Sequence, residues 1–105
     1  MTEDELIRGC LQDDASCQKE IFNRFAGRML GVCNRYARNS ADAEDILQDA
    51  FIKVFDKIYQ FKFEGSFEGW IRRIMVNTAL NFLKKNICFR QLMLLFLIQH
   101  ILIST

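Results

Sequence analysis

The chain has 105 residues and a formal net charge of +1; half of its residues are hydrophobic, with ten Phe and no Pro. This composition can bury one core, which excludes general disorder and a second domain, and the charge is too small for a uniformly basic nucleic-acid coat. The scarcity of Pro and Gly favours an all-α fold. Charge is uneven, however: residues 1–60 carry −3 and residues 61–105 carry +4, which predicts two surfaces with different partners.

Hydrophobic periodicity and capping residues predict a compact bundle of four helices over residues 1–86. The helices are expected from Thr2 to about Gln12, from after Asp14 to about Arg38, from near Ser40 to about Ile58, and from Ser66 to about Lys85. Thr2 and Glu5 have capping-box spacing, and Ser40 and Ser66 are the expected N-caps of the last two helices. A short aromatic connection, residues 59–66, joins those two helices.

Cysteine and histidine usage predicts no metal site. Cys10, Cys17, Cys33 and Cys88 form no CxxC pair, and His100 is the only histidine, so a zinc site is not expected. Cys10, Cys17 and Cys33 fall at apolar positions of helical patterns and are interpreted as small core residues, in preference to disulfide or redox roles, which fits a cytoplasmic protein. Without a Gly-rich phosphate loop, a nucleophile elbow or a Ser/His/Asp set, neither an enzyme nor a cofactor is expected. The acidic N-terminus predicts no signal peptide.

Residues 87–105 form a separate apolar tail that is expected to be helical. Leu92–Ile98 contains no polar residue, and only Gln99 and His100 interrupt the stretch to Ile103. This is shorter and more interrupted than the roughly 20 apolar residues of a membrane span. Three interpretations stay open: a helix packed onto the domain, a self-association surface, or foreign sequence such as a frameshift product.

The third predicted helix has two opposite faces when each residue advances by about 100°. Its expected core face consists of Ala43, Ile46, Leu47, Ala50, Phe51, Val54 and Ile58. The opposite stripe consists of Asp45, Gln48, Asp49, Ile52 and Asp56. Acidic stripes usually serve solubility, but Ile52 within one is typical of a docking anchor. The pattern leaves a partner site and a merely solvated face as equal alternatives.

The fourth predicted helix carries a basic, amide-rich stripe beside its buried side. The stripe consists of Trp70, Arg73, Asn77, Asn81 and Lys84, and the buried side of Ile71, Ile74, Met75, Thr78 and Phe82. The stripe residues are types that contact phosphates and bases. A solvated face with Trp70 partly in the core is the alternative. The aromatic residues nearby (Tyr59, Phe61, Phe63 and Phe67) favour binding of unstacked single-stranded bases.

Residues 20–85 resemble region 2 of bacterial RNA polymerase sigma factors of the extracytoplasmic-function group. Three segments carry the resemblance: EIFNRFAGRMLGVCNRYA, DAEDILQDAFIKVF and FKFEGSFEGWIRRIMVNTALNFLKK. The combination of AEDxxQxxF with the later F…F…W[IL]xRI…N is specific at this spacing. The resemblance implies a factor that recruits core RNA polymerase and holds the melted non-template strand of the promoter −10 element.

The resemblance also implies roles for individual residues. Asp45, Gln48 and Asp49 correspond to positions that meet the clamp coiled-coil of the largest polymerase subunit, and Ile52 extends this set. The implied DNA-binding residues are Phe61, Phe63, Ser66, Phe67, Trp70, Arg73, Asn77, Asn81 and Lys84. Those in the loop correspond to the segment that captures a flipped base, and those in the helix contact the upstream part of the same element.

Two departures from the family pattern define an alternative function. Gly69 precedes Trp70 where housekeeping sigma factors carry a second aromatic residue, and the apolar tail takes the place of the linker to a −35-reading domain. The alternative is a truncated, non-initiating interaction protein. In that case residues 92–103 would contact a second copy, an anti-sigma factor or a membrane.

Overall fold

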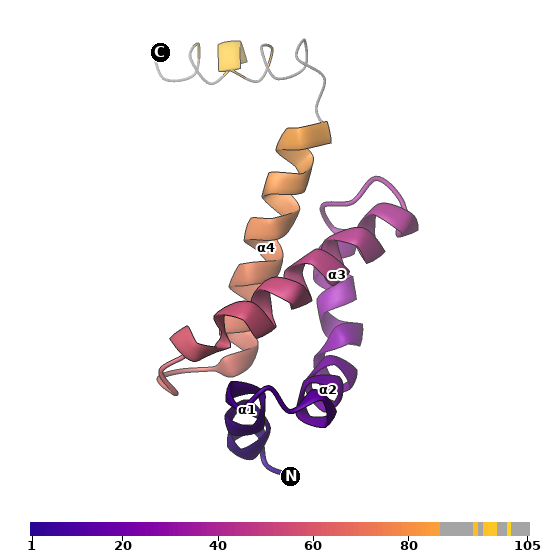
Figure 1. The fold of residues 1–105 in the computed structure, drawn as a ribbon. Coiled ribbons are helices and arrows are strands. Elements are labelled where there is room, and N and C mark those ends of the chain that lie inside the picture. The colour runs from indigo at the N-terminus through magenta and orange to yellow at the C-terminus, as the bar shows by residue number, and fades with distance from the viewer. Residues whose placement is uncertain (87–93, 95, 99–100, 102–105) are drawn as a thin grey trace.

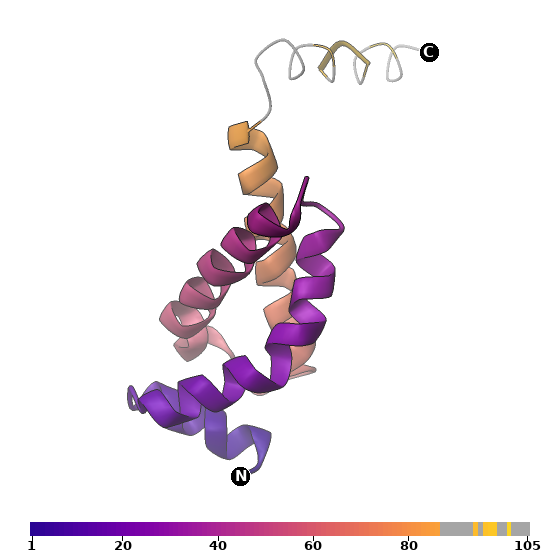
Figure 2. The ribbon, with the colours of Figure 1, turned by 90° about the vertical axis from the view of Figure 1, so that its right-hand side faces the viewer.

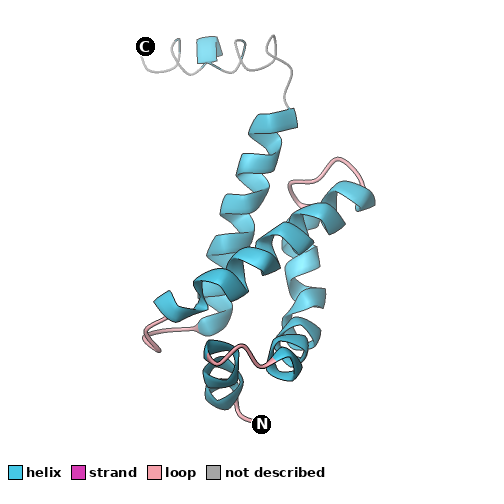
Figure 3. Cartoon of the chain, viewed as in Figure 1, coloured by secondary structure: helices cyan, strands magenta, loops and turns pink. Residues whose placement is uncertain are grey.

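The computed structural model describes residues 1–86, 94, 96–98 and 101, and it is all-α within that part of the chain. The elements are α1 (Glu3–Leu11), α2 (Ala15–Asn34), α3 (Ser40–Lys57), the short 3₁₀ helix η1 (Ile58–Gln60) and α4 (Phe67–Asn86). Helices α2, α3 and α4 pack against one another, while α1 contacts α2 and η1 (Figure 1). The quarter-turn view places α1 at one end of the molecule, beside the start of α2 (Figure 2). The four α-helices predicted for residues 1–86 are confirmed, and Figure 3 shows them as separate helical segments joined by loops.

A single apolar cluster lies between the helices. Helix α2 contributes a residue at every fourth position, namely Cys17, Ile21, Phe25, Met29 and Cys33. All seven residues of the expected core face of α3 are buried. On α4, Ile71, Met75 and Thr78 are buried as expected, whereas Ile74 and Phe82 are half-buried. Among the described residues, the buried core therefore lies before position 80, and it fixes the helices that carry the polar stripes.

Two predicted caps hold and one is wrong. Thr2 Oγ1 accepts a hydrogen bond from the Glu5 backbone N–H at 3.2 Å, and Ser66 Oγ accepts one from the Gly69 N–H at 3.1 Å. Ser40, in contrast, is the first residue of α3, because Asn39 Oδ1 accepts the Asp42 N–H at 2.8 Å. Asn39 has extended backbone angles, as a capping residue requires.

Helix α2 ends earlier than its periodicity predicts, whereas α3 ends within one residue of the predicted position. The expected end of α2 was Arg38, but the helix closes at Asn34, where the following N–H groups bond to Val32 and Cys33 carbonyls in a tightened turn. Helix α3 ends at Lys57, so Ile58 begins η1 while its side chain stays in the core. After Asn34 the chain turns toward α3, and this turn overrides the apolar pattern.

Burial raises the pKa of three thiols. Desolvation, with smaller contributions from Cys17 and Asp14, raises the pKa of Cys10 to about 11. Burial also raises the pKa of Cys17 and of Cys33 above the ordinary thiol value. These side chains are free cysteines that pack as small apolar groups, as the sequence predicts.

Of the apolar tail, five residues are described. Leu94, Phe96, Leu97, Ile98 and Ile101 are helical and exposed. The remaining predictions for residues 87–105, including self-association through residues 92–103, lie outside the described residues. Among the residues described, no helix combines the length and apolar character needed to cross a bilayer.

Candidate nucleic-acid interface

The connection between η1 and α4, residues 61–66, folds tightly back onto the first turn of α4. Phe63 and Gly65 have φ values of 59° and 76°, both in the left-handed region. Glycine adopts this region freely, whereas a phenylalanine does so only when its surroundings hold it there. Ser66 then caps α4 through its hydrogen bond to Gly69. We call residues 61–66 the recognition loop.

An aromatic cluster supports the recognition loop from the core. Phe61 and Phe67, 8% and 1% exposed, have ring centroids 5.1 Å apart. Trp70 is half-buried, and its ring stacks on that of Phe67 at 5.9 Å. Phe67, which the sequence predicts to bind DNA, is thus buried, and its ring supports the site from beneath through contacts with Phe25, Phe61 and Trp70. Phe63, at 37% exposure, keeps an accessible ring.

A cavity of about 550 Å³ lies between the recognition loop and the start of α4. Its lining residues are Gln60, Phe61, Lys62, Glu64, Gly65, Ser66, Gly69, Trp70 and Arg73. The volume is in the range of small-ligand sites. The cavity combines an apolar wall, Phe61 and Trp70, with two cationic side chains, Lys62 and Arg73, and one carboxylate, Glu64. Gly69 contributes no side chain to it, which leaves that part of the wall open.

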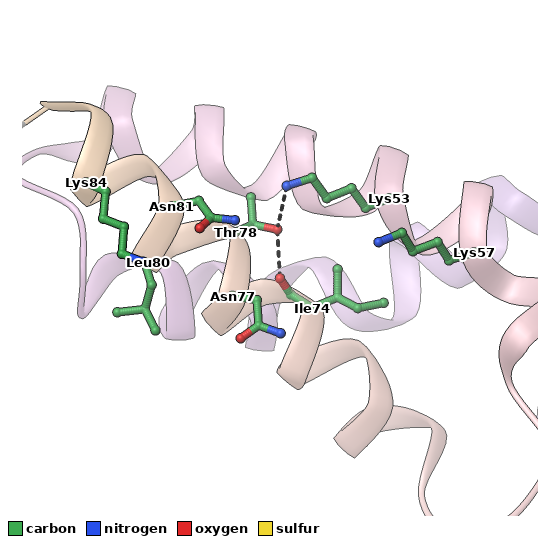
Figure 4. A pocket seen from close by; sticks show the side chains of 8 residues that line it. All are labelled: Lys53, Lys57, Ile74, Asn77, Thr78, Leu80, Asn81 and Lys84. Atoms are coloured by element: carbon green, nitrogen blue, oxygen red, sulfur yellow. Dashed lines mark hydrogen bonds between the residues drawn. The ribbon is translucent and has the colours of Figure 1, made fainter.

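A second, basic cavity of about 410 Å³ lies between α3 and α4 (Figure 4). Its lining residues are Lys53, Lys57, Ile74, Asn77, Thr78, Leu80, Asn81 and Lys84. Lys53 Nζ donates to Thr78 Oγ1 at 3.4 Å, and this hydroxyl donates to the Ile74 carbonyl at 2.7 Å. Within the described part of the chain its three lysines form no ion pair. This cavity, which we call the α3–α4 groove, thus carries uncompensated positive charge beside the amide side chains of Asn77 and Asn81.

Sequence reasoning missed Lys53 and Lys57, which line this groove from α3. They are four residues apart and lie at the edge of the core face, close to one another on the helix. Their spacing of four residues is enough to predict that the two lysines lie on the same side of the helix. Only the packing of α4 against that particular edge, however, places them opposite Asn77 and Asn81.

A smaller cavity of about 240 Å³ on the α2 side of α4 is lined by arginines. Its residues are Arg28, Val32, Arg35, Tyr36, Arg72 and Val76. Arg28 forms an ion pair with Glu68 and lies over the Phe25 ring at 5.5 Å. Arg35 and Arg72 have no carboxylate partner among residues 1–86. Helix α4 therefore has basic surroundings on both of its sides.

The predicted acidic stripe lies on the outer side of α3. Asp45, Gln48, Asp49 and Ile52 are all exposed, and Ile52 is 68% exposed. Neither aspartate forms an ion pair within residues 1–86. An isoleucine exposed among uncompensated carboxylates contributes nothing to the core. The arrangement is suited to a basic partner surface with a small apolar recess. We call these four residues the acidic face.

The known proteins that are similar to this chain are sigma factors. Residues 21–86 match the family model of sigma-70 region 2. The ECF RNA polymerase sigma-E factor of Haemophilus influenzae is 32% identical over 83 residues, which are 79% of this chain and 43% of that protein. The ECF RNA polymerase sigma factor SigE of Mycolicibacterium smegmatis is 35% identical over 66 residues, 63% of this chain and 25% of that protein. The chain thus spans less than half the length of these relatives.

A solved structure gives the same result for the fold. An engineered region 2 of sigma-E, determined by NMR in complex with GTAAAA, superposes with a TM-score of 0.75 at 29% identity. The match covers 81% of this chain and 88% of that one.

Proposed function

The chain belongs to the sigma-70 family, as a region 2 of the extracytoplasmic-function group, and on this premise we propose that it binds the single-stranded non-template strand of a promoter −10 element and docks on core RNA polymerase. The family is one of sigma factors and not of enzymes. The observation that carries the proposal is the pairing of the recognition-loop cavity with the basic groove along the same helix, α4.

The recognition-loop cavity would receive one unstacked base. Phe61 and Trp70 offer an apolar aromatic wall, and Ser66 and Arg73 offer polar groups at its edge. Removing a base from its stack costs a few kcal/mol, which a pocket that stacks and hydrogen-bonds the base can offset. A region 2 relative that was solved with GTAAAA supports this assignment.

The α3–α4 groove would hold the upstream part of the strand. Amide side chains such as Asn77 and Asn81 can pair with base edges. Lys53, Lys57 and Lys84 place positive charge where the phosphates of such a strand would run. Because both cavities share α4, one strand could follow the helix from the groove to the recognition loop.

The acidic face of α3 would contact the polymerase. Family resemblance assigns Asp45, Gln48 and Asp49 to the clamp coiled-coil of the largest subunit. Their exposure and the absence of intramolecular ion pairs within residues 1–86 support this role. Ile52 would supply the apolar anchor at the centre of the contact.

Fluorescence anisotropy with labelled GTAAAA tests the DNA proposal. We expect binding that weakens with salt, because lysines and arginines displace counterions from phosphates. The double variant R73A/N77A should bind more weakly and lower the dependence of log K on log salt by about 0.7. N23A/R24A removes the same residue types from the exposed surface of α2 and should bind like the wild type.

Two results would refute the DNA assignment. One is the absence of any binding at low salt. The other is an equal loss in both double variants, because this would indicate attraction by net charge and not by the surface along α4.

A further inference from the structure

Arg8 lies outside the cavities described above and yet contacts the recognition loop. It belongs to the last turn of α1, and its guanidinium carbon lies 4.9 Å from the centroid of the Phe63 ring. Arg8 forms no ion pair within residues 1–86. At this distance the guanidinium makes a cation–π contact. The first helix therefore holds a residue of the recognition loop directly.

Phe63 needs such support because of its backbone. Its φ of 59° brings Cβ close to the following carbonyl oxygen, which is unfavourable for any residue except glycine. Strained backbone persists only where the neighbouring structure holds it. Two contacts hold the Phe63 ring: the guanidinium of Arg8 and the ring of Phe61, whose centroid lies 5.3 Å away.

Ring contacts link Phe63 to the residues that line the cavity. The Phe61 ring lies 5.6 Å from that of Trp70, and both residues line the cavity. Arg8 is itself held in place, because Ile7 and Cys10 of α1 are buried and α1 packs against α2 and η1. A change at Arg8 can therefore reach the cavity through two ring contacts.

We propose that Arg8 is a positioning residue for the recognition loop: it holds Phe63 from α1, and thereby keeps Phe61 and Trp70 in the arrangement that receives a base. This inference rests on the proposed function of the cavity in binding DNA. Arg8 acts through Phe63 and needs no contact with the strand itself.

A double-mutant cycle on DNA affinity tests this role, with labelled GTAAAA as the probe. R8M should weaken binding about two- to fivefold, which is the range expected from one cation–π contact. In an F63L background, R8M should cause no further loss, because the ring that it acts through is gone. R38M removes an equal charge at the connection between α2 and α3, far from the recognition loop (Figure 1), and should leave the affinity unchanged. An equal loss from R8M in both backgrounds would mean that Arg8 merely attracts phosphates, which overturns the proposal.

A measurement on the free protein separates this proposal from the DNA assignment. Trp70 is the only tryptophan of the chain, so its fluorescence reports on the cavity wall alone. R8M should increase quenching of Trp70 by acrylamide, and R38M should not. If no oligonucleotide binds, the proposed function fails, but increased quenching in R8M would still support the positioning role. Unchanged quenching would overturn it.

Discussion

Reversing the charge of the acidic face should abolish polymerase binding and leave the fold almost unchanged. In D45R/D49R two carboxylates become guanidinium groups on exposed positions that form no ion pair within residues 1–86. Asp45 and Asp49 are one turn apart, so their mutual repulsion, about 0.2–0.5 kcal/mol, has the same size after reversal. The new term is repulsion between position 49 and Lys53, of similar size. The free energy of unfolding should therefore change by less than about 1 kcal/mol.

The effect on association should be far larger. Like charges facing each other across an interface cost several kcal/mol, which corresponds to at least about a hundredfold loss of affinity. Biolayer interferometry with bacterial core RNA polymerase measures the affinity, and thermal melting by circular dichroism measures the fold. D4R/E20R makes the same change in net charge at exposed positions of α1 and α2, and should bind nearly as the wild type does. Retained binding by a folded D45R/D49R, or an equal loss in the control, would refute the assignment of this face.

Three further predictions concern stability and assembly. In urea unfolding, G9A should destabilise the fold by about 1–3 kcal/mol, because its new Cβ would overlap the Cys17 sulfur. G27A is the control: its Cβ would meet nothing within 4 Å, so it should stabilise the fold by about 0.5–1 kcal/mol. Because the pKa of Cys10 is raised from 9.0 to about 11, the folded state retains a proton that the unfolded chain loses, so stability should fall as the pH rises through this window. C10A should show a shallower fall, and parallel curves would contradict the assignment. In light scattering, residues 1–86 alone should be monomeric and the full chain larger, since the described tail residues expose apolar side chains; equal sizes would argue against association through the tail.

Features set by local periodicity could be predicted from the sequence. The core face predicted for residues 43–58 is buried at all seven positions, six in α3 and Ile58 in η1, because burial on one side of a helix leaves a 3.6-residue pattern in the chain itself. The caps at Thr2 and Ser66 were predictable for a related reason: a cap is a contact over three residues. The acidic face follows from the same pattern, because its residues lie on the side of α3 opposite the buried residues and are therefore exposed.

Features set by packing between helices could not be predicted. Phe67 is of the same residue type as Phe63 and lies four positions away, yet it is buried at 1% exposure because α4 begins there and turns it onto Phe25, 5.6 Å between ring centroids. Lys53 is a binding candidate only because α4 packs along its edge of α3. The Arg8–Phe63 contact joins residues 55 positions apart, and no local pattern signals it.

The distribution of charge along α3 links the two proposed binding surfaces. Asp45 lies near the start of the helix and Lys57 in its last turn, about 18 Å apart along the axis and about 120° apart around it. This charge distribution complements the helix dipole through Asp42 in the first turn and Lys57 in the last turn, which stabilises α3 by itself. It also directs opposite charges to different sides of one rigid element. Because α3 packs on both α2 and α4, it cannot rotate without opening the core. The polymerase surface and the DNA groove would therefore be held at a fixed mutual position by the same buried residues.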